Sequence, residues 1–199
     1  MPKQVDHEQR RKQIAEALLR LAGRGGMEAV NLRDVAAEAG ISMGSVQHYF
    51  RTKEQMLQYA AGYVNDRAAE RIRARIEATD EPHSARTVVR AVLVEMLALS
   101  TESRQEYLVT IAFFVRALAE PDLAALYREW WPQLEQWITD LLRGAQEAGE
   151  IAAGVDVWME ARILLAVPDG LSIGLLLGHH GEADSVAMID HALDRVFAC

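Results

Sequence analysis

The stretch NLRDVAAEAGISMGSVQHYFRTK, residues 31–53, decides which fold we expect for this chain. Asn31 is a favoured N-cap residue, and apolar side chains follow it at helical spacing. Gly40 is expected to end that helix, because glycine adopts the left-handed conformation without a steric penalty. Ser42 can then cap a second helix over residues 43–49. The stretch therefore predicts two short helices joined by a tight turn.

The second helix has an apolar inner face and a polar outer face. Val46 and Phe50 are expected to point toward the core, which leaves polar side chains outside. Such a short helix can lie in a DNA major groove about 12 Å wide. Thr52 and Gln55 then form a T-x-x-Q capping pattern that starts a new helix at Lys53, where free backbone amides suit a phosphate. The stretch is typical of a helix-turn-helix.

These residues resemble the DNA-binding domain of the TetR family of one-component transcriptional repressors. The family motif is approximately T-x-x-I-A-x-x-A-G-V-S-x-G-x-x-Y-x-x-F-x-x-K. The matching positions here are Leu32, Val35, Ala36, Ala39–Ser42, Gly44, His48, Tyr49, Phe50 and Lys53. The resemblance is specific over residues 8–60 and architectural beyond them. It implies an all-α fold of about nine helices, with a three-helix helix-turn-helix head on a C-terminal helical bundle.

Three positions depart from the family pattern. Asn31 stands where the family often has threonine, and it can still cap a helix. Met43 replaces a frequent lysine, so one phosphate contact is expected to be missing. Gln47 replaces the usual tyrosine, and its amide can bond bidentately to adenine. The preferred half-site therefore cannot be taken from the family.

The helix pattern and the resemblance together predict which residues contact DNA. The residues expected mainly to hold phosphates are Arg33, Ser42, Tyr49 and Lys53. Those expected to meet base edges are Ser45, Gln47 and His48. Those expected to make a close apolar or backbone approach are Met43 and Gly44.

The charge distribution agrees with a DNA-binding head. The 199-residue chain has a formal net charge of −8, but residues 1–53 contain nine Lys and Arg against six Asp and Glu. A basic N-terminal block on an acidic body fits a protein that docks one face on nucleic acid. Arg10, Arg11 and Lys12 gather near the start of the first helix. Each of them could contact a phosphate or belong to a solvated charged face.

Composition favours a cytoplasmic protein, and no cofactor is expected. No run of eighteen apolar residues is uninterrupted, so a membrane span is not expected. The polar N-terminus, MPKQVDHEQRRKQ, lacks the hydrophobic region of a secretory signal. The single cysteine, Cys199, cannot form an internal disulfide.

Two rival motifs are less favoured. Residues 40–44, GISMG, match the G-x-S-x-G nucleophile elbow of serine hydrolases, but that motif requires a preceding β-strand and a helix is expected here. His179, His180, Asp184 and His191 could suggest a metal site, although no second ligand pair has the expected spacing. We find no acid–base or nucleophile constellation, so neither an enzyme nor a metal site is expected.

The chain is expected to form a DNA-binding domain over residues 1–53 and a ligand-binding and dimerisation domain over residues 54–199. A long helix, residues 53–78, connects them, and residues 79–83 form a linker. The other helices are expected at about 7–22, 32–39, 43–49, 85–100, 104–119, 122–148, 157–177 and 183–197. Ser103, with Glu106, is expected to cap the sixth helix.

Aromatic side chains crowd the body, where they could form plain core or line an apolar pocket between helices. In TetR-like repressors the body binds an effector that moves the DNA-binding heads. Arg116 and Asp169 are the polar candidates, because buried charged groups are usually paired or liganded. The full set of pocket candidates is Tyr63, Met96, Tyr107, Phe113, Phe114, Arg116, Tyr127, Trp130, Trp131, Trp137 and Asp169.

The last two helices are rich in small and aliphatic residues, and the resemblance implies that they form a homodimer interface. The favoured function is a homodimeric repressor that binds a pseudo-palindromic DNA operator and is released by a small, mostly apolar effector. The alternatives are a transcriptional activator on the same scaffold and a helical protein-interaction module.

Overall fold

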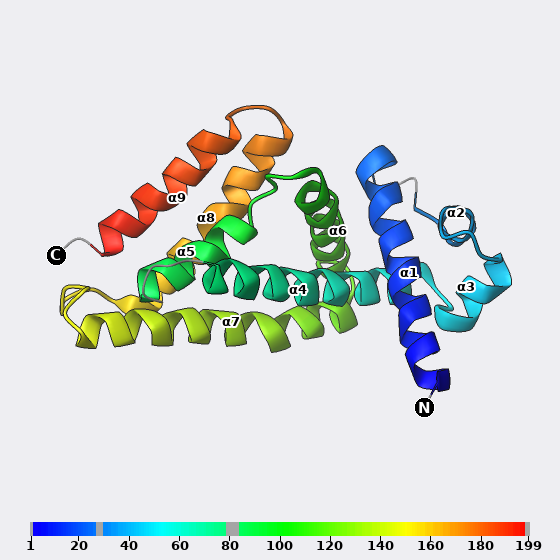
Figure 1. The fold of residues 1–199 in the computed structure, drawn as a ribbon, viewed down its shortest axis with the longest axis horizontal. Helices are drawn as coiled ribbons and strands as arrows, with labels where there is room; N and C mark the ends of the chain where they lie inside the picture. The colour runs from blue at the N-terminus through cyan, green and yellow to red at the C-terminus, as the bar shows by residue number, and fades with distance from the viewer. Residues whose placement is uncertain (1, 27–29, 79–83, 198–199) are drawn as a thin grey trace. The chain divides into compact units, whose positions relative to one another are not determined.

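The computed structural model describes residues 2–26, 30–78 and 84–197, and side chains from residue 7 onward. These residues form nine helices and no strand (Figure 1), which confirms the all-α prediction. The helices are α1 (Pro2–Gly25), α2 (Leu32–Glu38), α3 (Met43–Tyr49), α4 (Lys53–Glu77), α5 (Ala85–Glu95), α6 (Thr101–Ala117), α7 (Pro121–Glu147), α8 (Val157–Leu176) and α9 (Glu182–Val196). Within the described ranges, no helix is both long and apolar enough to cross a membrane.

The chain divides into two compact units. The first comprises Met1–Arg67 and Ser100–Ala124, and the second comprises Ala68–Leu99 and Ala125–Cys199. Helix α6 therefore lies in the same unit as α1, α2 and α3, although it is distant from them in sequence. The division into functional domains at residue 53 stays a prediction, because a compact unit is defined by packing alone.

The first unit is built on α1, which packs against α2 and α6, while α2 packs against α3. Its buried apolar side chains include Ile14, Leu18, Val35, Val46, Phe50, Met56 and Leu57. The contact between α1 and α6 is close at Gly23, where a Cβ atom would lie 2.2 Å from Cγ of Gln105. A larger residue at Gly23 would displace this glutamine side chain.

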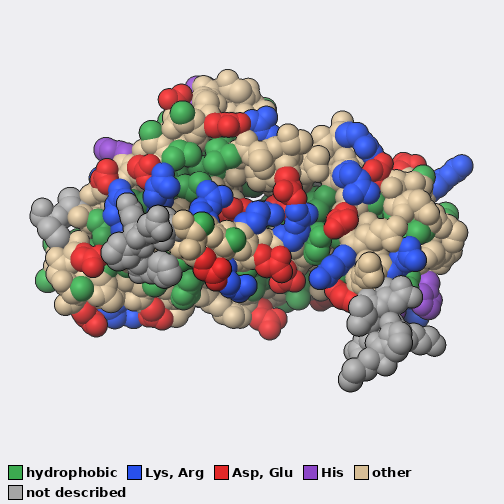
Figure 2. Space-filling model, in the orientation of Figure 1, with side chains coloured by type: hydrophobic (Ala, Val, Ile, Leu, Met, Phe, Trp, Pro, Cys, Tyr) green, Lys and Arg blue, Asp and Glu red, His purple; other side chains and the backbone are tan. Residues whose placement is uncertain are grey.

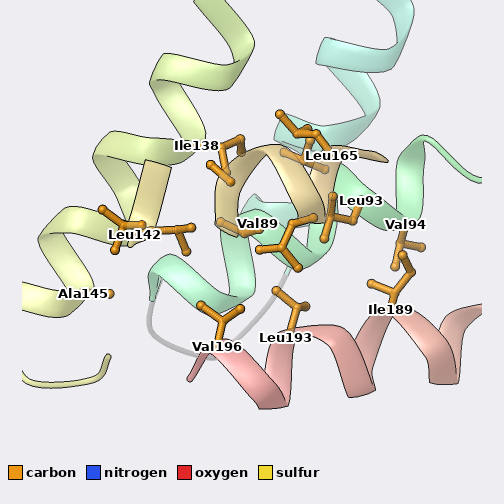
Figure 3. Packing of buried hydrophobic residues seen from close by; sticks show 14 of the residues in the cluster. Val89, Leu93, Val94, Ile138, Leu142, Ala145, Leu165, Ile189, Leu193 and Val196 are labelled. Carbon is orange, nitrogen blue, oxygen red and sulfur yellow. The ribbon is translucent and has the colours of Figure 1, made fainter. Parts of the chain in front are cut away.

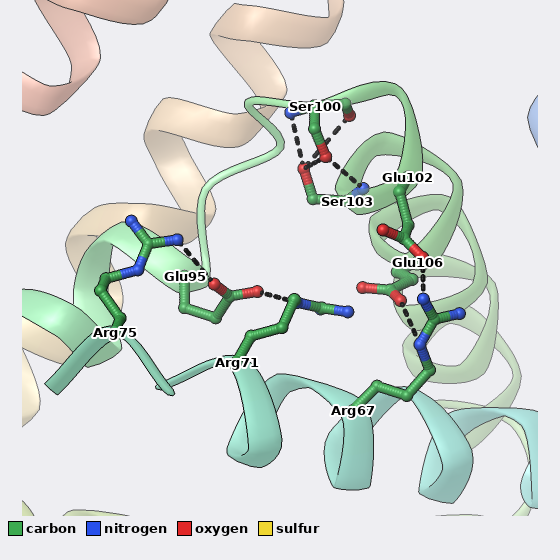
Figure 4. Close-up of polar contacts among 8 residues, drawn as sticks. All are labelled: Arg67, Arg71, Arg75, Glu95, Ser100, Glu102, Ser103 and Glu106. Carbon is green, nitrogen blue, oxygen red and sulfur yellow. Dashed lines mark hydrogen bonds and ion pairs between the residues drawn. The ribbon is translucent and has the colours of Figure 1, made fainter. Parts of the chain in front are cut away.

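Charged side chains of both signs are interspersed on the face shown in Figure 2. In the first unit, Arg67 of α4 pairs with Glu102 and lies 3.7 Å from the carboxylate of Glu106 on α6. In the second unit, Arg71 and Arg75 bond to opposite oxygens of Glu95 at 2.6 and 3.0 Å (Figure 4). These ion pairs attach α4 to α6 in one unit and to α5 in the other.

The second unit has a core of aliphatic side chains from four helices. Val89 and Leu93 of α5, Leu142 of α7, Leu165 of α8 and Leu193 of α9 are all buried in one cluster (Figure 3). Burying each such side chain stabilises the fold by about 1.5–3 kcal/mol relative to leaving it exposed. The cluster explains why these helices form one compact body.

Four predicted helix ends are wrong. Helix α1 ends at Gly25, three residues after the predicted end near residue 22. Helix α1 begins at Pro2, before the predicted start near residue 7, and α5 ends at Glu95 instead of near Ser100. Ser100, and not Ser103, caps α6: its hydroxyl accepts the Ser103 amide at 3.0 Å (Figure 4). The Ser103 hydroxyl accepts the Ser100 amide at 2.8 Å. A serine therefore takes the N3 place that Glu or Gln usually fills in a capping box.

Candidate nucleic-acid interface

Local hydrogen bonds build the turn between α2 and α3. The Asn31 side chain accepts the Asp34 amide at 2.9 Å, and the Ser42 hydroxyl accepts the Ser45 amide at 3.1 Å. Gly40 has φ of 67°, the left-handed conformation expected at the end of α2. Both predicted caps and the glycine stop are confirmed, and they set the direction in which α3 leaves the turn.

Helix α3 buries one face and presents the other to solvent. Val46 and Phe50 are 0% and 1% exposed, as the apolar pattern predicts. The predicted DNA contacts that are exposed are Arg33, Ser42, Met43, Gly44, Gln47 and His48, and those that are half-buried are Ser45, Tyr49 and Lys53. Their individual roles stay predictions. Their accessibility leaves the outer face of α3 available for a major groove.

Helix α1 holds α2 in place through polar contacts. The Gln13 amide donates to the Ala39 carbonyl at 2.7 Å. Arg20 bonds to Glu38 at 2.7 Å, and Arg24 pairs with the other oxygen of the same carboxylate. The hydrogen bonds from Arg20 and Arg24 lower the pKa of Glu38, so this carboxylate stays charged in the folded head. These contacts make α1 and α2 a firm support for α3.

Tyr49, at the end of α3, lies among aromatic rings. Its ring centroid is 4.6 Å from that of His7 on α1 and 5.1 Å from that of His48. The His7 and His48 rings are themselves 6.4 Å apart. The position of the Tyr49 ring is therefore supported from α1 as well as from its own helix.

The start of α4 carries the predicted phosphate contact Lys53. The Thr52 hydroxyl accepts the Gln55 amide at 3.2 Å, as the capping pattern predicts. The Gln55 side chain accepts the amide of Arg51 at 2.9 Å instead of returning to Thr52. Lys53 therefore stands in the first turn of a capped helix, where the helix dipole favours an anion.

Neither rival motif has the geometry that its chemistry needs. Ser42 follows helix α2 and caps α3, and the described residues contain no strand that could form a nucleophile elbow. His180 bonds to the Ser185 hydroxyl at 2.9 Å through Nδ1. Within the described ranges, no three His, Cys, Asp or Glu side chains are close enough to hold a metal ion.

Among the pocket candidates in the second unit, three aromatic residues of α7 come together. The Tyr127 ring stacks on Trp131 at 5.4 Å and meets the edge of Trp130 at 5.6 Å. Burial raises the pKa of Asp169 on α8, and the charge of this carboxylate contributes to raising the pKa of Tyr127, after the larger effect of burial. Met96 follows α5 as its C-cap, whereas Trp137 is 43% exposed.

The remaining pocket candidates belong to the first unit. Phe113 and Phe114 lie 6.0 Å apart on α6, and the same helix carries the half-buried Tyr107. The Tyr63 hydroxyl donates to Glu16 at 2.8 Å. Arg116 donates to Glu54 at 2.7 Å and to Glu120 at 2.5 Å. Arg116 is thus an ion-paired contact between α6 and the start of α4, and its role in a pocket stays a prediction.

The sequence did not indicate a groove beside α3. The groove has a volume of about 570 Å³ and is lined by residues of α1, the end of α3 and α4. Across it, the Tyr59 hydroxyl donates to Glu8 at 2.6 Å. These two residues are 51 positions apart, and no local pattern relates them.

A tight turn followed by a capped, solvent-exposed helix is the helix-turn-helix arrangement, and the described residues around it form helices and no strand. Two protein-family profiles match: bacterial regulatory proteins of the tetR family over residues 14–60, and the C-terminal part of BetI-type transcriptional repressors over residues 85–198. The chain therefore belongs to the TetR family, whose members are transcriptional regulators and not enzymes.

Individual relatives extend over most of the chain. The HTH-type transcriptional regulator PksA of Bacillus subtilis is 32% identical over 177 residues, which cover 89% of this chain and 83% of that protein. A TetR-family regulator from Rhodococcus sp. has a TM-score of 0.80 and 26% identity, over 96% of this chain and 99% of that one. A regulator from Saccharomonospora viridis, solved in complex with choline, has a TM-score of 0.82 at 23% identity, over 94% and 96%.

Proposed function

We propose that this TetR-family regulator is a homodimeric repressor that binds a pseudo-palindromic operator and is released by a small effector. The observation that carries the proposal is the exposed polar face of α3, braced by α1 and α2. Arg33, Ser42, Tyr49 and Lys53 hold operator phosphates, which position the protein without reading sequence. Ser45, Gln47 and His48 read base edges, while Met43 and Gly44 allow close approach.

The proposed dimer forms through α8 and α9. On α8 and at its C-cap, exposed apolar residues recur at helical spacing with exposed fractions of 45–80%: Met159, Ile163, Ile173 and Leu177. Met188 of α9 is 42% exposed. Hydrophobic side chains are visible at the surface over these helices in Figure 2. An apolar face of this kind usually marks an interface. Two heads about 34–36 Å apart would then read the two halves of a pseudo-palindrome.

The effector is proposed to be a small, mostly apolar molecule that binds in the body. The aromatic cluster of Tyr127, Trp130 and Trp131 supports this site, with Asp169 as a polar group. Because a fold neighbour binds choline, choline belongs in the first ligand panel beside hydrophobic compounds. All four tryptophans lie on α7 and α8, so tryptophan emission reports directly on this body.

The proposal is tested by fluorescence anisotropy with two labelled duplexes at two salt concentrations. One duplex carries the DNA directly upstream of the gene for this protein, and the other carries the same bases scrambled. We expect tight, salt-sensitive and selective binding to the upstream duplex, because phosphate contacts release counterions and base contacts discriminate. Absence of binding to either duplex, by folded dimer, would instead favour a protein-interaction module.

The ligand panel is then added to the complex with its operator. We expect one compound to change tryptophan emission and to release the DNA in the same concentration range. A reporter gene behind the operator distinguishes the two regulatory roles, because expression falls with a repressor and rises with an activator. If every compound leaves both emission and DNA affinity unchanged, the effector site loses its support.

A further inference from the structure

The three cations near the start of α1 have different surroundings. Arg10 donates to the Gln13 side chain at 2.7 Å. Lys12 is exposed and lines the groove beside α3. Arg11 is half-buried and lines the same groove, where it lies near the end of the recognition helix. These three neighbouring cations therefore differ in exposure and in partners, although the sequence gives no reason to separate them.

The Arg11 guanidinium is held by aromatic rings and by no polar partner among the described residues. Its central carbon lies 4.1 Å from the centroid of Tyr59 and 5.3 Å from that of Phe50. Its Nε is buried without a hydrogen-bond partner. An unsatisfied buried donor is costly, and a guanidinium presents a planar fork of donors that matches a phosphate. The ring contacts hold the Arg11 guanidinium at the groove. Its N–H donors make no hydrogen bond within the described part of the chain.

Two carboxylates also line the groove, and their positions limit where an anion can bind. Glu8 accepts the Tyr59 hydroxyl, and burial together with that hydrogen bond raises the pKa of Tyr59, so the phenol remains a donor to Glu8. Asp66 lies eleven residues beyond Gln55 on α4, about 16 Å along the helix axis. The part of the groove near Tyr49 and Gln55 therefore lies away from Asp66 and offers hydroxyl and amide donors beside Arg11. Glu8 is close to Arg11, because both contact Tyr59, but its carboxylate is already engaged by the Tyr59 hydroxyl.

We propose that Arg11, assisted by Lys12, binds a phosphate group in this groove. The operator backbone is the expected source, because Tyr49 lies both on the proposed DNA face and on the wall of the groove. This inference rests on the proposed function for the source of the phosphate. A free phosphate-bearing molecule is the other source, and it would compete with DNA for the same end of α3.

The experiment compares the salt dependence of DNA binding by wild type, R11Q and R20Q. Arg20 is the matched control, since it lies on the same helix and is paired with Glu38. Affinity for the upstream and scrambled duplexes is measured by anisotropy between about 50 and 200 mM salt, the range over which counterion release changes DNA affinity strongly. R11Q is expected to lower the slope of log affinity against log salt by about one, whereas R20Q keeps the wild-type slope.

A second arm titrates inorganic phosphate into wild type and R11Q without DNA, by calorimetry. Saturable binding to wild type that R11Q abolishes would support the site with a free phosphate source, even if the DNA slope is unchanged. An unchanged slope together with no phosphate binding would overturn the inference and leave Arg11 a packing residue. Far-ultraviolet circular dichroism checks each fold, and R11M replaces R11Q if the glutamine variant does not fold, because the methionine stem still packs on the rings.

Failure of the proposed function gives a different result. In that case wild type binds neither duplex at any salt concentration, so log affinity has no slope to compare. The titration with inorganic phosphate then shows by itself whether Arg11 binds a phosphate group.

Discussion

At the scale of single residues, Gln47 is the side chain through which this protein is expected to differ from its family in DNA preference. It is exposed on α3, whereas the buried face of that helix is occupied by Val46. Q47A should reduce affinity for the preferred operator by about 1–3 kcal/mol and leave affinity for scrambled DNA unchanged. Anisotropy titrations of both duplexes measure the difference. Q136A, an exposed glutamine of α7, is the control, and an equal loss on both duplexes would contradict base reading by Gln47.

Asp169 is expected to make the free energy of unfolding depend on pH. Burial raises the pKa of Asp169 above its unfolded value, so the folded state holds this proton more tightly and loses stability as pH rises through the folded pKa. D169N should therefore raise the free energy of unfolding at pH 7.5. The advantage should shrink as the pH is lowered toward the ordinary carboxyl pKa, because wild type then becomes protonated.

Urea unfolding of wild type and D169N at several pH values measures this effect. D190N is a control for which the opposite effect is expected. Hydrogen bonds from Arg90 lower the pKa of Asp190. The charged Asp190 therefore stabilises the fold at neutral pH, and this stabilisation is lost as pH falls through the lowered pKa. D190N should therefore destabilise at pH 7.5 and approach wild type in acid. A D169N variant that is less stable than wild type at neutral pH would show that the charged form is stabilised.

At the scale of elements, the start of α6 depends on Ser100. S100A removes the side-chain acceptor for the Ser103 amide and should lower the free energy of unfolding by about 1 kcal/mol. T101A, one residue further along the same exposed turn, should change it by less than about 0.5 kcal/mol. Urea unfolding monitored by circular dichroism compares the two. Equal effects would mean that the cap does not set the stability of α6.

Ion pairs attach α6 to α4 near both ends of α6 in the first unit. Arg67 meets Glu102 and Glu106 near the start of α6, and Arg116 meets Glu54 near its end. Helix α6 packs against α1 and shares a compact unit with α3, so its aromatic residues belong to the unit that carries the predicted DNA contacts. An effector that contacts α6 would therefore touch that same unit.

At the scale of the whole molecule, the proposed dimer depends on the apolar face of α8. I163E places a charge in the middle of that face and should shift the protein from dimer to monomer, with loss of operator binding. V115E is the matched control, because Val115 is 62% exposed on α6. Multi-angle light scattering at micromolar protein measures the mass. A dimeric I163E variant would place the interface elsewhere.

The helix-turn-helix could be predicted from sequence because its determinants are local. Asn31 and Asp34, like Ser42 and Ser45, are three residues apart, and Gly40 acts through its own backbone. The helical spacing of apolar residues and the capping hydrogen bonds both relate residues three or four positions apart. They can therefore be recognised in the sequence alone. The prediction at Ser103 was wrong for a related reason: Ser100 and Ser103 are three residues apart and either could cap a helix, and in the folded chain the cap is Ser100.

The sequence by itself determined the all-helical class, the caps around the recognition helix and the resemblance to TetR regulators. Only the tertiary structure decided which of three neighbouring cations is stacked on Tyr59, and that Arg116 meets Glu54 across 62 residues. Glu8 and Tyr59, and Arg90 and Asp190, are likewise brought together over 51 and 100 residues. Such contacts form when buried apolar faces pack, and that packing depends on the whole set of helices at once.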